Sequence, residues 1–163
     1  MPARAVVAVL QQTRRHHAIE HATIHLLAAR YPRVTLGGLS DPWGFTLFGR
    51  VSRESVEDAV CEALLRLKAG EEEMAFHPNC GTSLTTRILL ATAAAIIGSA
   101  GSRRTLFEKV TLTTGLVTLG LLIAGPLGMR LQRLTTSAAV DCLGLADIVP
   151  VGEAHRVTFS SSN

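Results

Sequence analysis

The chain has few charged residues, few aromatic side chains and only three cysteines. Charged residues account for 18% of its 163 positions, below the quarter that is usual in soluble proteins. Aromatic residues reach 4%, and the net charge of +3 is spread along the chain instead of gathering in one patch. Nucleic-acid binding needs a basic surface, and single strands also need stacking aromatics, so we expect no nucleic-acid partner.

The cysteines Cys61, Cys80 and Cys142 are odd in number and include no CxxC pair, which argues against a disulfide framework. The N-terminal residues also lack the basic region, the long apolar run and the cleavage site of a secretory signal peptide. We therefore expect the soluble parts of the chain to face the cytoplasm.

Two long uncharged runs lie in the second half of the chain. Fifteen uncharged residues separate Arg87 from Arg103, and twenty separate Lys109 from Arg130. At about 1.5 Å per residue these runs span roughly 22 and 30 Å as helices, against about 30 Å for a bilayer core. We expect a multi-pass membrane protein whose contact with the lipid bilayer is a two-helix transmembrane hairpin at 83–133.

Small residues recur in these runs at a spacing of four, in the pairs Ala91/Ala95, Ala94/Gly98 and Ala124/Gly128. Such pairs let helices pack closely in lipid, so the hairpin could also associate with a membrane-protein partner or a second copy. The alternative is a soluble helical hairpin inside a larger core. The rest of the chain is too short to cover two helices that are apolar on every side.

Outside the hairpin, the pattern predicts an α+β fold built from a soluble segment at 1–82 and a C-terminal segment at 134–163. The expected elements are a helix at 3–30 with a break near 11–15, β-type runs at 33–36 and 45–51 around a glycine- and proline-rich turn, an amphipathic helix at 52–68 and a strand at 155–159. The last strand could pair with the hairpin at 33–51.

Two of these elements have clear boundary signals. Tyr31-Pro32 should end the first helix, because the residue before a proline disfavours the α conformation. Ser52 is the expected N-cap of the amphipathic helix. Its inward-facing residues should be Val56, Ala59, Val60, Ala63, Leu64 and Leu67.

Four of the six histidines lie in one ten-residue stretch, 16–25, inside the first helix. His17, His21 and His25 share one face of that helix at a spacing of four. Two imidazoles four residues apart can chelate one metal ion. The helix is apolar almost all round, which predicts that this face is buried and that its polar groups need partners. A metal ion would meet that need, a hydrogen-bonded polar core is the second possibility, and an exposed or partner-binding face is the third.

The string from His17 to His21 reads H-x-x-E-H, and here the sequence resembles the inverted zinc peptidases, the inverzincins. The resemblance implies that His17 and His21 are zinc ligands and that Glu20 is a general base acting on zinc-bound water. The family's third ligand is a glutamate further along the chain, at a distance that falls here in the first uncharged run. The remaining candidates for a third ligand are His77, Cys80, Glu57, Glu62 and the run Glu71–Glu73.

His77 and Cys80 stand three apart in the turn-rich string HPNC, so both could reach one ion. Together with His17 and His21 they would close a four-ligand set, which is typical of a structural or regulatory site. The alternative is a turn that holds one buried cysteine and a capping histidine. The predicted metal ligands are thus His17, His21, His25, His77 and Cys80, with zinc as the metal and Glu20 as the catalytic residue.

A wider resemblance rests on three strings, HHAIEHATIHLL, GGLSDPWGFTLFG and HPNCGT, followed by the apolar hairpin. In these the chain looks like an uncharacterised family of small bacterial membrane proteins that carries the label of a domain of unknown function. The resemblance implies no activity. Two functions therefore stay open: a membrane-anchored metal-binding protein, with a zinc-dependent hydrolase as its sharper form, and a non-enzymatic membrane scaffold or assembly factor without metal.

Overall fold

An antiparallel β-sheet with helices on one face dominates the computed structural model, which describes residues 2–77, 80–101 and 103–161. The fold class is α+β, as predicted, with four α-helices and four strands in the described residues. The chain divides into two units. The first unit is Met1–His77 together with Thr135–Asn163, and the second is Pro78–Leu134.

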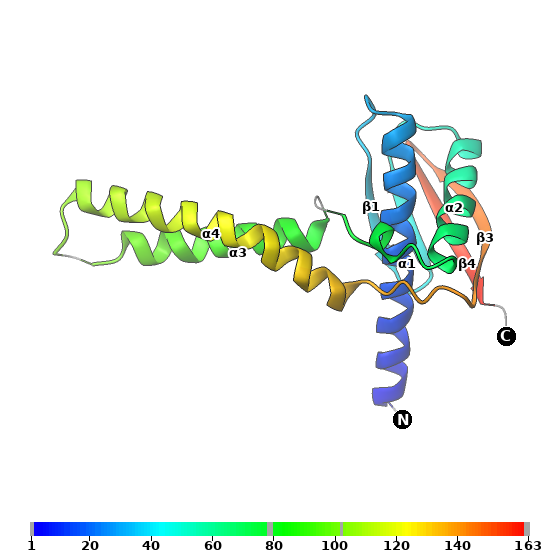
Figure 1. Ribbon diagram of the computed structural model, residues 1–163, viewed down its shortest axis with the longest axis horizontal. Coiled ribbons are helices and arrows are strands. Elements are labelled where there is room, and N and C mark those ends of the chain that lie inside the picture. The colour runs from blue at the N-terminus through cyan, green and yellow to red at the C-terminus, as the bar shows by residue number, and fades with distance from the viewer. Residues whose placement is uncertain (1, 78–79, 102, 162–163) are drawn as a thin grey trace. The chain divides into compact units, whose positions relative to one another are not determined.

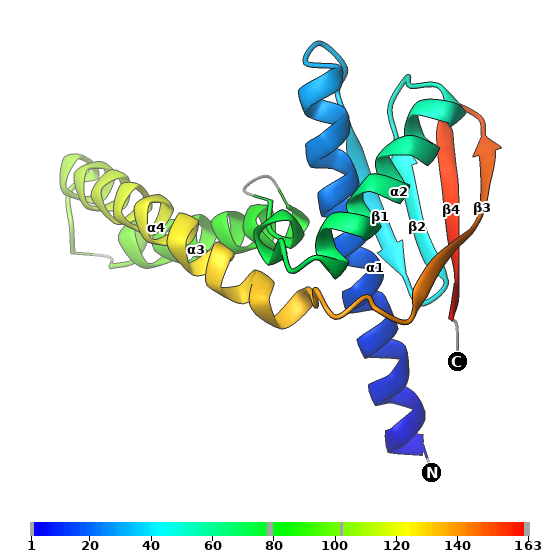
Figure 2. The ribbon, with the colours of Figure 1, turned by 45° about the vertical axis from the view of Figure 1, so that its right-hand side comes forward.

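The sheet of the first unit has the strand order β1-β2-β4-β3, and every neighbouring pair is antiparallel. The strands are β1 (Gly37–Asp41), β2 (Gly44–Phe48), β3 (Leu143–Val151) and β4 (Ala154–Ser161). β4 pairs with β2, with His155 opposite Leu47, so the two segments that flank the second unit share one sheet. The long helix α1 (Pro2–Arg30) and the helix α2 (Arg53–Lys68) lie on the same face of this sheet (Figure 1, Figure 2).

The first strand does not lie where the sequence pattern predicted it. The run 33–36 is not a strand, and β1 occupies residues that were interpreted as a turn. The turn itself is short, because the Asp41 carboxylate accepts the backbone N–H groups of Trp43 (2.8 Å) and Gly44 (3.1 Å). The strand needs a glycine at position 38 because of packing, since a Cβ there would collide with the Glu20 carboxylate.

α1 is one continuous helix, so the predicted break near residues 11–15 is wrong. The segment QQTRR contains good helix formers in glutamine and arginine. The Thr13 hydroxyl donates to the Val9 carbonyl at 3.0 Å, which satisfies the one side chain that competes with the helix. The helix ends at Arg30, directly before Tyr31-Pro32, as predicted.

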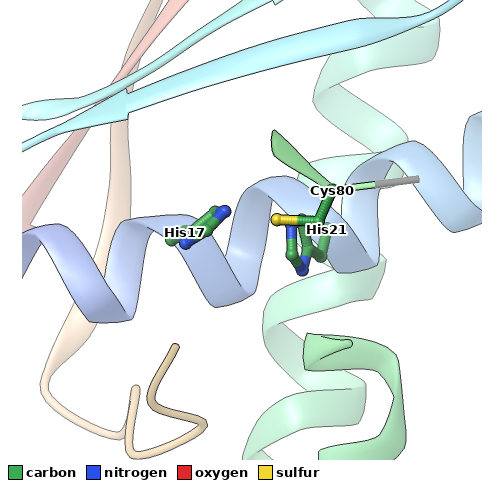
Figure 3. Close-up of side chains that lie close together, drawn as sticks. All are labelled: His17, His21 and Cys80. Carbon is green, nitrogen blue, oxygen red and sulfur yellow. The ribbon is translucent and has the colours of Figure 1, made fainter. Parts of the chain in front are cut away.

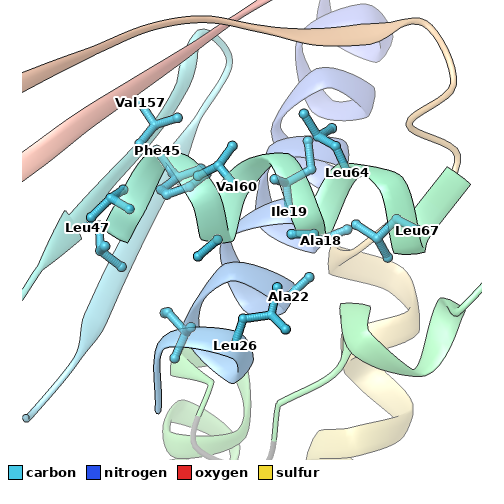
Figure 4. Packing of buried hydrophobic residues seen from close by; sticks show 14 of the residues in the cluster. Ala18, Ile19, Ala22, Leu26, Phe45, Leu47, Val60, Leu64, Leu67 and Val157 are labelled. Atoms are coloured by element: carbon cyan, nitrogen blue, oxygen red, sulfur yellow. The ribbon is translucent and has the colours of Figure 1, made fainter. Parts of the chain in front are cut away.

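The core lies between the sheet and the two helices, where Ile19 of α1, Val60 of α2 and Phe45 of β2 are fully buried (Figure 4). α2 confirms its sequence pattern in full. Ser52 is its N-cap and accepts the N–H of Ser55, and the buried residues are the predicted Val56, Ala59, Val60, Ala63, Leu64 and Leu67. The 3-10 helix η1 (Glu72–Ala75) follows and packs on α1.

The second unit consists mainly of α3 (Gly81–Ser99) and α4 (Leu106–Thr135), both long and apolar enough to cross a membrane. Only 17% and 6% of their most apolar windows are buried. Small residues bring the two helices together. A Cβ on Gly98 would lie 2.5 Å from the Thr113 Cα, and a Cβ on Gly128 would lie 2.9 Å from the Ser83 Cα.

Candidate metal centre

α1 places His17, His21 and His25 on successive turns of one face. His21 is buried, and His17 and His25 are half-buried. The His17 and His21 rings meet edge to face with their centroids 4.3 Å apart. The face is covered because η1 and the chain around Thr135 pack against it. The predicted burial of this face is confirmed for His21 and holds in part for His17 and His25.

Each of these three rings donates one N–H to a backbone carbonyl. The Nδ1 atoms of His17 and His21 donate to the carbonyls of Thr135 (3.1 Å) and Ala75 (2.7 Å). The Nε2 atom of His25 donates to the carbonyl of Phe76 at 2.8 Å. Because a carbonyl only accepts, the bonded nitrogen carries the proton and the other nitrogen of each neutral ring keeps a lone pair. Histidines that bind metals are oriented in this same way.

The residues after η1 bring a fourth imidazole to the group. The His77 ring lies 4.6 Å from the His25 ring and 6.1 Å from the His21 ring, measured between centroids. Burial, followed by the proximity of His25 and His21, lowers the pKa of His77 to about 4. His77 is therefore neutral at pH 7.

The spacing of the His17 and His21 rings is compatible with a shared ion. Two imidazoles on one tetrahedral zinc have centroids about 5 Å apart, given a zinc–nitrogen distance of about 2.0–2.1 Å. The observed separations of 4.3, 4.6 and 6.1 Å lie on both sides of that value. Ring nitrogens of His17 and His21 already lie within 4.8 Å of each other.

Cys80 is the first described residue after His77, and Figure 3 labels it together with His17 and His21 of α1. Cys80 stands three positions after His77, so chain connectivity alone keeps the two Cα atoms within about 11 Å. A thiolate added to imidazoles gives the mixed nitrogen–sulfur donor set that zinc prefers.

Two carboxylates that the sequence offered to the site, those of Glu20 and Glu62, have other partners in the structure. Glu20 is buried, accepts a hydrogen bond from the Ser40 hydroxyl and lies against Gly38 of β1. Glu62 forms ion pairs with Arg30 and Arg66. The sheet therefore holds the carboxylate of Glu20, and an arginine pair holds that of Glu62.

His16 has a role that the sequence pattern did not assign. It is buried on a different face of α1, stacks on Phe159 with centroids 5.1 Å apart and donates its Nδ1–H to the Asp41 carbonyl at 2.9 Å. Burial is the main cause that lowers the pKa of His16 below 6.5. The Asp41 carboxylate in turn pairs with Arg156 at 2.7 Å. His16 is thus a hydrogen-bonded core residue, which is the second possibility that the sequence left open for this helix.

Comparisons with known proteins place the whole histidine group inside a matched region. The family described as "Domain of unknown function (DUF6391)" matches residues 12–148. An uncharacterized protein of Picosynechococcus sp. is 36% identical over 149 residues, which cover 83% of this chain and 70% of that protein. No solved structure matches the chain.

Proposed function

Since the chain belongs to the family of the domain of unknown function DUF6391, and membership brings no activity with it, we propose a function from its own residues. The protein is membrane-anchored and binds a transition-metal ion, most simply zinc, through His17, His21 and His77. His25 is the fourth imidazole of the group, and Cys80 supplies a thiolate.

One observation carries this proposal: backbone carbonyls orient the neighbouring imidazoles of His21 and His25, so that the lone pair of each neutral ring lies on its other nitrogen. A polar core without metal would be expected to pair its histidines with one another or with acids through both ring nitrogens. Here the bonds to the carbonyls of Ala75 and Phe76 fix one nitrogen each of His21 and His25. This arrangement supports metal binding, because it fixes the ring orientation before the ion arrives.

The membrane anchor rests on the exposure of α3 and α4. A core helix of a soluble protein would be mostly buried, whereas 17% and 6% of these two apolar windows are buried. The lengths of 19 and 30 residues correspond to about 28 and 45 Å, so α3 nearly matches a bilayer core of about 30 Å and α4 exceeds it. We propose a multi-pass hairpin in the lipid bilayer with both chain ends in the cytoplasm, and a close-packed helix pair that leaves its outer faces for lipid, a partner or a second copy.

A zinc-dependent hydrolase is the sharper form of this function. Glu20 directly precedes His21, is buried, and has its carboxylate held by Ser40. The proposed role requires this carboxylate to reach a metal-bound water and take its proton. The decisive variant is Glu20→Gln. It should keep the metal and lose a peptidase activity of the wild type, and an activity that survives the substitution would leave metal binding without this chemistry.

A scaffold or assembly factor without metal is the second candidate, favoured by the open face of the sheet. Leu39, Phe48 and Val151 are exposed there, on β1, β2 and β3 respectively. Phe48 and Val151 flank Ala154 of β4 in the sheet register, so they lie close together. An exposed apolar group of this kind is typical of an interaction surface. A membrane protein that co-purifies in equal amount, with no metal present, would favour this function.

The test of metal binding is a zinc titration of the detergent-solubilised, chelator-stripped protein by calorimetry. The wild type should take up about one zinc ion per chain, and His17→Ala/His21→Ala should take up none. His155→Ala is a matched control, because this buried histidine lies on β4 outside the group. Equal zinc uptake by the double variant and the wild type would contradict the proposal.

A further inference from the structure

The N-terminal segment of α1, residues 4–13, has no packing partner among the described residues of the first unit. α1 continues beyond the sheet and α2 toward the N-terminus (Figure 1, Figure 2). Val6 is 57% exposed and Leu10 is 56% exposed, although both are apolar. A helix of this length is marginal in water without a surface to pack on, so we expect the apolar side of the segment to bind a partner.

The side chains of this segment are sorted by polarity around the helix. At 100° per residue, Val6, Leu10, Val7 and Val9 fall within one broad arc. Arg4, Gln11 and Gln12 occupy the opposite side. The Thr13 hydroxyl lies within the apolar arc, but its hydrogen bond to the Val9 carbonyl satisfies it as a donor. The segment is an amphipathic helix.

The apolar side of the segment continues the face that carries the histidines. Leu10, Arg14, His17 and His21 follow one another at spacings of four, three and four. Residues at both borders of the first unit contact this same face. The carbonyl of Thr135, where the chain returns, accepts from His17, and His77, where it leaves, packs on His25. Both connections to the proposed membrane hairpin therefore start on this side of α1.

The charge of the segment also favours a bilayer surface as the occupant. Residues 4–13 contain the basic Arg4 and no acidic residue, whereas Arg14 and Arg15 donate to the Thr136 carbonyl and the Cys142 sulfur. A basic, amphipathic helix without acidic residues complements anionic headgroups at a bilayer surface. A second copy of the same segment would instead bring like charges together.

We propose that residues 4–13 lie in the plane of the membrane surface, with Val6, Val7, Val9 and Leu10 in the interfacial layer of an anionic bilayer. The inference rests on the membrane-anchored part of the proposed function and is independent of the metal. It makes α1 a second attachment to the bilayer, which would hold the histidine face close to the membrane surface.

The test uses tryptophan fluorescence of the full chain reconstituted in vesicles of phosphatidylcholine and phosphatidylglycerol. Trp43 is exposed on the β1–β2 turn, so W43F provides a background without tryptophan. The W43F protein then receives one new tryptophan, through either L10W on the apolar side of the segment or Q12W on the polar side. We expect the emission of L10W to be blue-shifted and quenched by brominated lipid, and Q12W to be markedly less quenched.

Three results would overturn the inference. The first is equal, water-like emission from both variants. The second is a blue-shifted emission of L10W that brominated lipid does not quench, since it would mean that Leu10 packs against protein, such as a second copy. The third is quenching unchanged when phosphatidylglycerol is omitted. Resistance of the same samples to alkaline carbonate extraction is scored separately, because it tests the hairpin anchor and not the segment.

Discussion

Metal binding should raise the thermal stability of the protein in a way that depends on His21 and not on His16. The two histidines are closely matched. His16 is 3% exposed and His21 is 2% exposed, and each donates its Nδ1–H to a backbone carbonyl, at 2.9 and 2.7 Å respectively. They differ in position, because His21 lies among the clustered imidazoles and His16 stacks on Phe159.

Without metal, both alanine variants should be destabilised. His21→Ala leaves the carbonyl of the fully buried Ala75 without its donor, at a cost of about 1–3 kcal/mol. His16→Ala loses an equivalent hydrogen bond and a ring stack, which together are worth about 1–3 kcal/mol. With zinc at a hundred times its Kd, the ion should stabilise the wild type by about 2.7 kcal/mol. For a chain of this length that corresponds to a rise in Tm of about 5–11 °C.

The assay is thermal unfolding of the detergent-solubilised protein, with chelator and with zinc, for the wild type and both variants. The rise in Tm on adding zinc should persist in His16→Ala and vanish in His21→Ala. Loss of the rise in both variants, or its persistence in His21→Ala, would refute the reasoning, because the zinc effect would then not depend on the clustered imidazoles.

Three further predictions concern other parts of the chain. Gly98→Ala should lower the free energy of unfolding of the helix pair by about 1–3 kcal/mol, because the added Cβ would lie 2.5 Å from a backbone atom of α4. Gly115→Ala is the control, because an added Cβ there meets open space. Thermal melts in detergent compare the stabilities of the two variants. Burial raises the pKa of Asp41, but hydrogen bonds from the Arg156 side chain and two backbone N–H groups outweigh burial and hold the pKa below 3.8. The stability that Asp41 contributes is therefore present above pH 3.8 and is lost as the pH falls through the lowered pKa. Asp41→Asn should flatten the acid side of the curve of stability against pH, and an unchanged slope would contradict this. In the cobalt-loaded protein, Cys80→Ser should remove the near-ultraviolet thiolate-to-cobalt band, and Cys61→Ser should leave it. Burial and then two nearby carboxylates raise the pKa of Cys61, which disfavours the thiolate form that binds metals. The reverse result would exclude Cys80 as a ligand.

Helices with local signals were predictable from the sequence. α2 has an N-cap at Ser52, a regular apolar spacing and an end near Lys68, and all three are determined within the helix itself. The apolar lengths of α3 and α4 likewise follow from composition alone. The β-strands depend on distant residues and were less predictable. β1 was misplaced because Gly38 has its place through contact with Glu20, eighteen positions earlier in the chain.

β3 was missed for a related reason. Gly144 and Pro150 interrupt its pattern, and a register irregularity lies between Leu145 and Asp147, so no alternation is visible in the sequence. What makes it a strand is its pairing with β4. Strand formation of this kind depends on tertiary context and not on local propensity.

At the histidine group, the spacing of His17, His21 and His25 predicted a shared helical face, and the structure has it. The tautomers could not be predicted, because the carbonyls that fix them belong to Ala75 and Phe76, some fifty residues away. The separate role of His16 depends on Phe159 and Asp41, which only the fold brings near. A helical projection was the available signal, since it places His16 off the face of the other three.

The most direct test of the central claim is the metal content of the protein as it is purified from membranes in detergent, without added metal or chelator. Elemental analysis should find about one zinc ion per chain in the wild type and in His16→Ala, and none in His17→Ala/His21→Ala. A wild type without metal, or a double variant that keeps its zinc, would contradict the account and leave the histidine face as a polar core or a docking surface.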